Sequence, residues 1–192
     1  MLRALFLAPP GAGKGTQGPG LAEAYEVPYI ATGDMLRAHV VEGTPLGLAA
    51  KSIMAEGELV GDELIIEMVL ERITKPTRLT GFVLDGFPRT IAQAEAAYSW
   101  GQAVGSTFHA VLSLDVPEDE LIRRVEERGK DSARADDDIA TFKHRLEIYQ
   151  DETRPLIEYY RERQILIEVD GTGGVDDVAA RLRTAVDALD LT

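Results

Sequence analysis

Short, almost wholly apolar runs alternate along this chain with longer segments in which polar and apolar residues mix. The apolar runs cover residues 2–8, 27–30, 82–85, 110–115 and 165–170. They are too short and too uniformly apolar for strands with one face in water, so we interpret them as buried parallel strands with helices on both faces. The pattern therefore predicts a doubly wound α/β fold.

The segments between these runs carry the start and stop signals of helices. Pro117 is followed by two carboxylates, which is typical of a first helical turn, and Gly129 is placed as a helix stop. The aspartates at 136–138 likewise precede a helical pattern that contains Phe142 and Leu146. We expect helices to begin at both places.

Several apolar runs end in Asp or directly before a glycine-rich turn. In open α/β sheets, ligands bind at the carboxyl ends of the strands. We therefore expect the functional site at this edge of the sheet.

Composition narrows the class of protein. The 192 residues are 45% hydrophobic and predict one domain, and the net charge of -13 argues against a nucleic-acid binder, which needs a basic face. The chain has no cysteine, which excludes disulfides and thiolate metal sites. No secretory signal is recognisable, and no apolar run reaches the ~20 residues that span a bilayer. We expect an acidic cytoplasmic protein without membrane partners.

A candidate phosphate loop stands in "LFLAPPGAGKGTQGPG", residues 5–20. It departs from G-x-x-x-x-G-K-[ST] twice, because Ala8 replaces the first glycine and Gly15 follows Lys14. The lysine ammonium and successive backbone N–H groups still form an anion-binding nest. The residues of this nest are Gly11, Ala12, Gly13, Lys14, Gly15 and Thr16. An ordinary glycine-rich turn between a strand and a helix is the alternative.

The run "PGAGKGTQ" resembles the loop of adenylate kinases and related nucleoside monophosphate kinases. The resemblance implies a three-layer P-loop fold with a five-stranded parallel sheet, a single kinase domain over 1–192, a helical AMP-binding insert over 31–60 and a short lid over 127–137. It also implies Mg²⁺ carried with ATP, held by phosphate oxygens, waters and, through water, by Asp85.

Gly18, Pro19 and Gly20 depart from the good helix formers that this family usually carries after its loop. A helix-interior proline costs about 3 kcal/mol and each glycine about 1 kcal/mol. We expect Pro19 to kink or loosen the helix, and expect alanines at all three positions to raise the melting temperature.

Two motifs resemble the family's AMP site: "ATGDMLR" at 31–37 and "DGFPRT" at 85–90. The first motif alone also fits a plain capped helix, and the segment at 58–60 also fits a hydrophobic patch. Thr32, Thr90 and Gln93 are more similar to adenylate kinases than to uridylate–cytidylate kinases. The implied AMP site comprises Thr32, Arg37, Glu58, Leu59, Val60, Gly86, Phe87, Pro88, Arg89, Gln93, Arg134 and Arg145.

Arginines gather in "RRVEERGKDSARADDDIATFKHRL". Arg124 and Arg128 are four residues apart and share a helix face. Acidic residues lie among the arginines, so a solvated charged region is the alternative without the phosphate loop. The resemblance implies that Arg124, Arg128 and Gly173 contact ATP, although a bare turn also explains Gly173. The short lid leaves no room for a zinc-binding insert, so zinc is not expected.

The resemblance implies reversible transfer of a phosphoryl group from MgATP to AMP, giving two ADP. Lys14, Arg89, Arg134 and Arg145 are the expected catalytic residues, since phosphoryl transfer depends on positioning and charge stabilisation. The expected partners are ATP, AMP and ADP, bound by a monomer. The alternatives are another nucleoside monophosphate kinase, acting on UMP or CMP, and a nucleotide-binding switch without catalysis.

Overall fold

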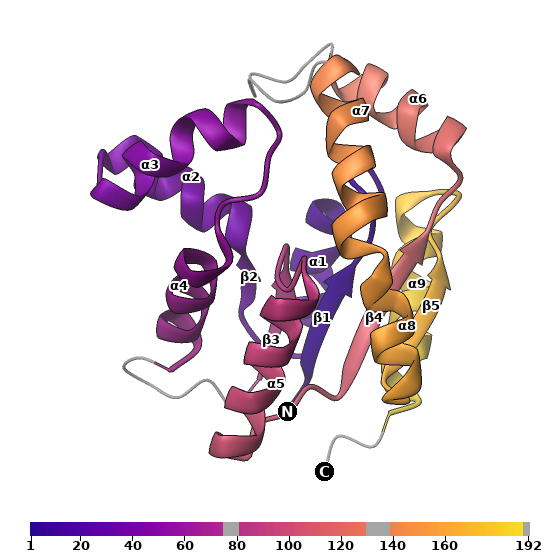
Figure 1. Cartoon of the computed structure of the whole chain (residues 1–192). Helices are drawn as coiled ribbons and strands as arrows, with labels where there is room; N and C mark the ends of the chain where they lie inside the picture. Colours follow the sequence, from indigo (N-terminus) through magenta and orange to yellow (C-terminus); the bar gives the residue numbers. More distant parts are fainter. Residues whose placement is uncertain (75–80, 130–138, 190–192) are drawn as a thin grey trace.

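In a computed structural model that describes residues 1–74, 81–129 and 139–189, five parallel strands form one sheet of order β2-β3-β1-β4-β5 (Figure 1). The strands are β1 (Arg3–Leu7), β2 (Tyr29–Ala31), β3 (Phe82–Asp85), β4 (Ala110–Asp115) and β5 (Leu166–Asp170). All carboxyl ends point to the same edge, because every neighbouring pair is parallel.

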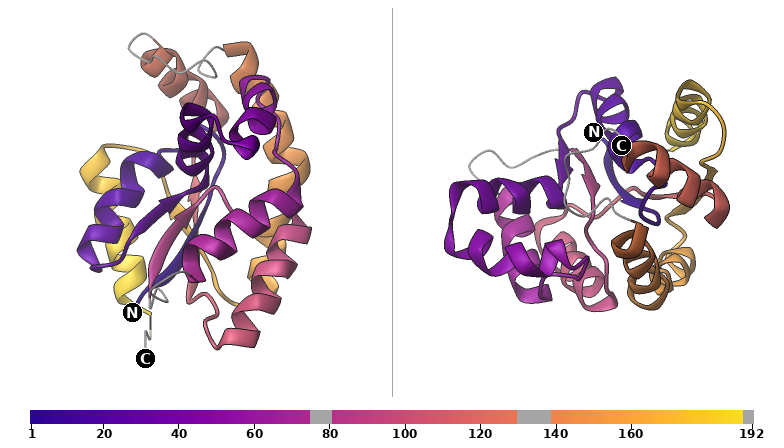
Figure 2. Two further views of the ribbon diagram at one scale, coloured as in Figure 1. Left: turned by 90° about the vertical axis from the view of Figure 1, so that its left-hand side faces the viewer. Right: turned by 90° about the horizontal axis from the view of Figure 1, so that it is seen from above.

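Helices cover both faces of the sheet, α1 beside α9 on one face and α4, α5 and α8 on the other (Figure 2). A pair of packed helices, α2 and α3, stands apart from the sheet (Figure 1). The helices are α1 (Lys14–Ala24), α2 (Thr32–Glu42), α3 (Pro45–Ala55), α4 (Asp62–Thr74), α5 (Ile91–Val104), α6 (Glu118–Gly129), α7 (Ile139–Ile148), the π-helical turn η1 (Tyr149–Thr153), α8 (Pro155–Glu162) and α9 (Val175–Asp187).

The central strand β1 shows why its residues are apolar on both faces. Ala4 and Phe6 pack with the cluster that includes α1 and α9, whereas Leu5 and Leu7 pack with the cluster beneath α4, α5 and α8. All four side chains are at most 3% exposed. Alternate side chains of a strand enter opposite cores, as a doubly covered parallel sheet requires.

The predicted α/β fold with a five-stranded parallel sheet is confirmed. The bounds of β3 and β4 agree with the predicted runs, and β1, β2 and β5 differ from them at their ends. Thr90 caps α5 by accepting a hydrogen bond from the Gln93 backbone N–H at 3.2 Å. The helices expected after Pro117 and after 136–138 begin at Glu118 and Ile139.

The helix after the phosphate loop bears on the expectations for Gly18, Pro19 and Gly20. α1 continues through Pro19 to Ala24, so the proline does not end the helix. A Cβ atom added at Gly18 would lie 2.2 Å from Cε2 of Tyr29, whereas at Gly20 no described atom lies within 4 Å. The expectation that alanines at all three positions raise the melting temperature stays a prediction, and the ring of Tyr29 next to Gly18 opposes it at that position.

Candidate active site

A cavity of about 970 Å³ opens at the carboxyl ends of the strands, where the site was expected. Its wall brings together segments from β1, the phosphate loop, the end of β3, α6, α7 and the turn after β5. The predicted residues in the wall are Gly11, Ala12, Gly13, Lys14, Gly15, Thr16, Arg37, Leu59, Asp85, Gly86, Pro88, Arg89, Arg124, Arg128, Arg145 and Gly173.

The phosphate loop turns tightly from β1 into α1. Gly11 and Gly13 have φ angles of +80° and +99°, which side chains disfavour, and α1 begins at Lys14. The Lys14 ammonium donates hydrogen bonds to the carbonyl oxygens of Ala8, at 2.7 Å, and Pro9, at 3.0 Å. These two oxygens occupy donors that phosphate oxygens would take in a nucleotide complex.

The pKa of Lys14 is lower than that of an ordinary lysine. Burial lowers the pKa of Lys14 to about 8, Asp85 opposes this shift, and Arg89, Arg145 and Arg128 add to it. The lysine and these arginines therefore repel one another across the cavity wall. Such a group of cations is suited to anionic ligands, which relieve the repulsion.

Arg124 connects three parts of the cavity wall. Its guanidinium donates to the carbonyl oxygens of Ala12, at 3.3 Å, and Gly171, at 2.9 Å, while Nε donates to Glu120 at 2.7 Å. Gln17 makes a similar link, since its Nε2 donates to the carbonyl oxygen of Val175 at 2.9 Å. The phosphate loop is thus joined to the turn after β5 by side chains.

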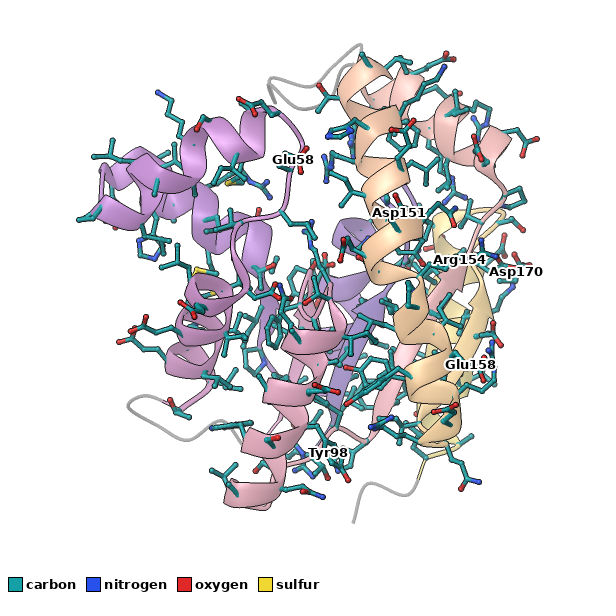
Figure 3. The ribbon with its side chains drawn as sticks, viewed as in Figure 1. Glu58, Tyr98, Asp151, Arg154, Glu158 and Asp170 are labelled. Carbon is teal, nitrogen blue, oxygen red and sulfur yellow. The ribbon has the colours of Figure 1, made fainter. Side chains whose placement is uncertain are left out.

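The turn that contains Gly173 is held by Asp170, which Figure 3 labels at the end of β5. Its carboxylate accepts hydrogen bonds from the Thr172 backbone N–H, at 2.9 Å, and hydroxyl, at 2.7 Å, which lower the pKa of Asp170. Arg181 donates to the carbonyl oxygens of Asp170 and Thr172. Gly173 itself has φ +92° and lines the larger cavity.

A smaller cavity of about 60 Å³ lies on the side of α2 and α3. The predicted residues in its wall are Thr32, Arg37, Glu58, Leu59, Val60, Gly86, Arg89, Gln93 and Arg145. Phe87 lies instead in the core, with 1% exposure. Arg37, Arg89 and Arg145 line both cavities, so the two spaces meet at three guanidinium groups.

Backbone contacts orient Arg89. Its Nε donates to the carbonyl oxygen of Gly86 at 3.0 Å, and its own carbonyl oxygen accepts from the Thr153 hydroxyl at 2.8 Å. Burial is the main cause that lowers the pKa of Arg89, and Arg145 is the next. The guanidinium is thus held at the junction of the cavities beside a second cation.

The amide of Gln93 is oriented by Asp62, a residue that the sequence analysis missed. Gln93 Nε2 donates to Asp62 Oδ1 at 2.7 Å, and Gln93 Oε1 accepts from the Arg89 backbone N–H at 2.8 Å. Asp62 Oδ2 also accepts from the Thr90 hydroxyl at 3.0 Å. Asp62 stands in the first turn of α4, where carboxylates are common because they stabilise a helix start. Its place in the sequence therefore gave no indication that it contacts Gln93.

The start of α2 is joined to the end of β3. The Thr32 hydroxyl donates to the carbonyl oxygen of Gly86 at 2.9 Å, and Thr32 is only 2% exposed. Arg37, one turn further along, forms an ion pair with Asp34 at 2.5 Å. Arg37 thus lines the wall of the smaller cavity together with Gly86, which follows β3.

Asp85 is one of three carboxylate residues on the wall of the larger cavity, together with Asp34 and Glu120. Carboxylate oxygens are preferred magnesium ligands, and Mg²⁺ commonly binds one or two carboxylates together with nucleotide phosphates and water. Asp85 ends β3 and lines the cavity together with Lys14. Its Oδ2 accepts a hydrogen bond from the Tyr29 hydroxyl at 2.7 Å, a partner that the sequence analysis also missed.

The segment after α3 faces α7 across the smaller cavity. Glu58, labelled in Figure 3, accepts a hydrogen bond at 2.6 Å from Nε2 of His144. This bond is the main cause that raises the pKa of His144. A Cβ atom added at Gly57 would lie 2.9 Å from Cγ of Arg145, so the two segments approach closely.

Arg134 and most of the predicted lid, 127–137, lie outside the described residues. In the ranges 1–74, 81–129 and 139–189, no group of three or more His, Cys, Asp or Glu could hold a metal. None of the helices in that part of the chain has the length and apolar character needed to cross a membrane.

Comparisons with known proteins agree with this geometry. A sequence model described as adenylate kinase matches residues 6–165. The chain is 45% identical over 188 residues to an adenylate kinase from a Nocardioides species, with 98% of each chain covered. It is 43% identical over 185 residues to one from Xylella fastidiosa (strain M12), covering 96% of this chain and 99% of the relative. It is 44% identical over 195 residues to one from Trichodesmium erythraeum, covering 98% and 100%. The chain belongs to the adenylate kinase family.

Proposed function

We propose that this chain binds ATP in the larger cavity and AMP in the smaller one, and transfers the γ-phosphoryl group where the cavities meet. Phosphoryl transfer between ATP and AMP is the activity of its family, adenylate kinase. The observation that carries the assignment of sites is that Arg37, Arg89 and Arg145 line both cavities.

On the ATP side, the backbone N–H groups from Gly11 to Thr16 and the Lys14 ammonium bind the phosphates. Lys14 exchanges the carbonyl oxygens of Ala8 and Pro9 for phosphate oxygens, which raises its pKa because the ligand is anionic. Arg124 and Arg128 lie beside the phosphates on α6, and the turn at Gly173 contacts the adenine.

On the AMP side, Arg37 and Arg89 bind the monophosphate, and Gln93 reads the adenine edge. Thr32 and Gly86 line the nucleoside, and the segment at 58–60 passes alongside it. Pro88 shapes the turn, and Phe87 acts from the core by supporting that turn. Residues 31–60 form the AMP-binding segment of the single domain, and 127–137 form a short lid.

The transfer itself needs positioning and charge stabilisation, and no catalytic base is required. Arg89, Arg134 and Arg145 neutralise charge on the phosphoryl group during its transfer, while Lys14 binds the phosphates of ATP. Asp85 would hold Mg²⁺ through water, and the bound ion supplies charge neutralisation at the phosphate oxygens. Closure of the lid over both substrates excludes water as a competing acceptor.

We expect the chain to act as a monomer. Size-exclusion chromatography with light scattering tests this at working concentrations. Because ATP and AMP are nucleotides of the cell interior, we assign the activity to the cytoplasm.

A coupled assay of ADP formation from ATP, with AMP, CMP, UMP or GMP as acceptor, tests the function. We expect AMP to be strongly preferred. Preference for CMP or UMP would indicate another monophosphate kinase, and nucleotide binding without ADP formation would indicate a switch. The Arg145→Ala and Arg134→Ala variants should lose about 10³-fold in kcat, as arginine fingers do.

A further inference from the structure

Tyr29 reaches Asp85 diagonally across two strands. β2 pairs with β3 so that Ala31 lies opposite Asp85 and Tyr29 lies opposite Val83. Tyr29 and Ala31 are two residues apart and therefore share a face of the sheet. The tyrosine ring spans this offset, and its hydroxyl donates to Asp85 Oδ2 at 2.7 Å.

Gly18 provides the space that the ring needs. A Cβ atom at Gly18 would lie 2.2 Å from Cε2 and 2.8 Å from Cζ of Tyr29. Gly18 is buried inside α1, where its backbone has no positive φ that would call for glycine. Its lack of a side chain therefore serves the passage of Tyr29 beneath the helix.

We propose that Tyr29 is a positioning residue: its hydroxyl holds the Asp85 carboxylate toward the magnesium–phosphate region, and Gly18 lets the ring reach it. The inference rests on the proposed role of Asp85. Hydrogen bonds to a ligand carboxylate fix its orientation, and the loss of such a partner typically weakens metal binding about 10-fold or more. Tyr29 acts through Asp85, so it is not itself a magnesium ligand.

The test measures binding of the non-transferring β,γ-imido analogue of ATP by calorimetry, once with Mg²⁺ and once with EDTA. The ratio of the two affinities reports how much the ion contributes. In the Tyr29→Phe variant we expect this ratio to fall about 10-fold, while the affinity in EDTA stays within about twofold. Gly18→Ala should lower the ratio similarly, because a methyl group displaces the ring and breaks the same bond.

The double variant separates this coupling from two independent defects. Once the hydroxyl is gone, adding Gly18→Ala to Tyr29→Phe should leave the ratio unchanged. Melting of the nucleotide-free protein in EDTA gives a second readout: the combined loss should be smaller than the sum of the single losses.

Two matched control variants test whether a substitution of the same kind elsewhere also changes the affinity ratio. Tyr25→Phe removes another tyrosine–carboxylate bond, the 2.6 Å contact of Tyr25 with Asp187, and Gly20→Ala adds a methyl group to the exposed side of the same helix. Both should keep the parental ratio. An unchanged ratio in Tyr29→Phe would overturn the inference while leaving the adenylate kinase assignment intact. A parent chain that neither binds the analogue nor forms ADP would overturn both.

Discussion

At the scale of single residues, Lys14 combines burial with a charged function. Its folded-state pKa of about 8 means that part of the ligand-free protein holds a neutral lysine at slightly alkaline pH. Phosphate favours the charged ammonium, so we expect nucleotide binding to draw a proton from the solvent. This places a titration of the binding site itself near physiological pH.

Proton uptake can be measured directly. At pH 8, binding of the ATP analogue should take up roughly half a proton, and at pH 6.5 almost none, because the lysine is then already charged. Calorimetry in two buffers with different ionisation enthalpies gives the number. The Lys14→Met variant is the control, and equal uptake by parent and variant at pH 8 would contradict the role of this lysine.

Asp62 tests whether the orientation of Gln93 controls acceptor choice. Asp62→Ala should raise KM for AMP about 10-fold with little change in kcat, because the glutamine amide loses the acceptor at 2.7 Å. The ratio of kcat/KM for AMP to kcat/KM for CMP should fall as well.

Glu63→Ala is a matched control, since Glu63 stands beside Asp62 in the first turn of α4 and is exposed. It removes the same charge and should leave KM unchanged. Equal effects of both substitutions on KM would show that Asp62 acts only through its negative charge in the first turn of α4, and not through its contact with Gln93.

At the scale of elements, α1 contains two glycines in different surroundings: Gly18 packs against Tyr29, and Gly20 is exposed. Gly20→Ala should raise the melting temperature by about 2–4 °C, because alanine is the better helix former by about 1 kcal/mol. Gly18→Ala should lower it, since Tyr29 must move. Thermal unfolding followed by circular dichroism distinguishes the two, and stabilisation by both would contradict the packing at Gly18.

The contact of Glu58 with His144 joins the segment after α3 to α7, and its stabilising effect should depend on pH. The pKa of His144 is raised, so the stabilisation is fully present below about pH 6.5, the ordinary histidine value, and is lost as pH rises through the folded-state pKa. Both side chains are over 40% exposed, so we expect at most about 3 °C.

The measurement compares melting temperatures of the parent and His144→Gln between pH 5.5 and 8.5. The difference should shrink as pH rises. The comparison is repeated with Glu58→Gln, where the His144 substitution should lose most of its pH dependence; the weaker contact of His144 with Glu147, at 3.8 Å, accounts for any remainder. A difference that grows with pH would contradict the pairing.

Local signals explain what could be predicted from the sequence. The strands are continuous apolar runs, and residues such as Lys14, Arg89 and Gln93 stand in short motifs whose spacing is set within one segment. Asp62 and Tyr29 escaped prediction because their partners lie 31 and 56 residues away and become neighbours only when strands and helices pack. The closeness of Gly18 to Tyr29 could not be predicted for the same reason, since helix propensity ignores the neighbouring strand.

At the scale of the whole molecule, a net charge of -13 coexists with a cavity lined by Lys14 and several arginines. The cations converge because the carboxyl ends of the parallel strands share one edge. Among the described acidic residues, Asp34, Asp85 and Glu120 line the same cavity, and the others lie outside its wall. We therefore expect the chain to bind polyphosphates at this cavity although its net charge is strongly negative.

A ligand that spans both cavities should stabilise the entire fold. Two adenosines joined through a chain of phosphates, at 100 times the dissociation constant, should add about 2.7 kcal/mol and raise the melting temperature by about 5–10 °C. Differential scanning calorimetry measures this shift. Arg145→Ala should reduce the shift at the same ligand concentration, and a full shift in that variant would exclude Arg145 from the junction.

The links from Arg124 to Gly171 and from Gln17 to Val175 have a consequence for biosynthesis. The phosphate loop leaves the ribosome first, yet the carbonyl oxygens that brace it belong to residues translated more than 150 positions later. A nascent chain should therefore acquire tight nucleotide affinity only after β5 and the start of α9 have emerged from the exit tunnel.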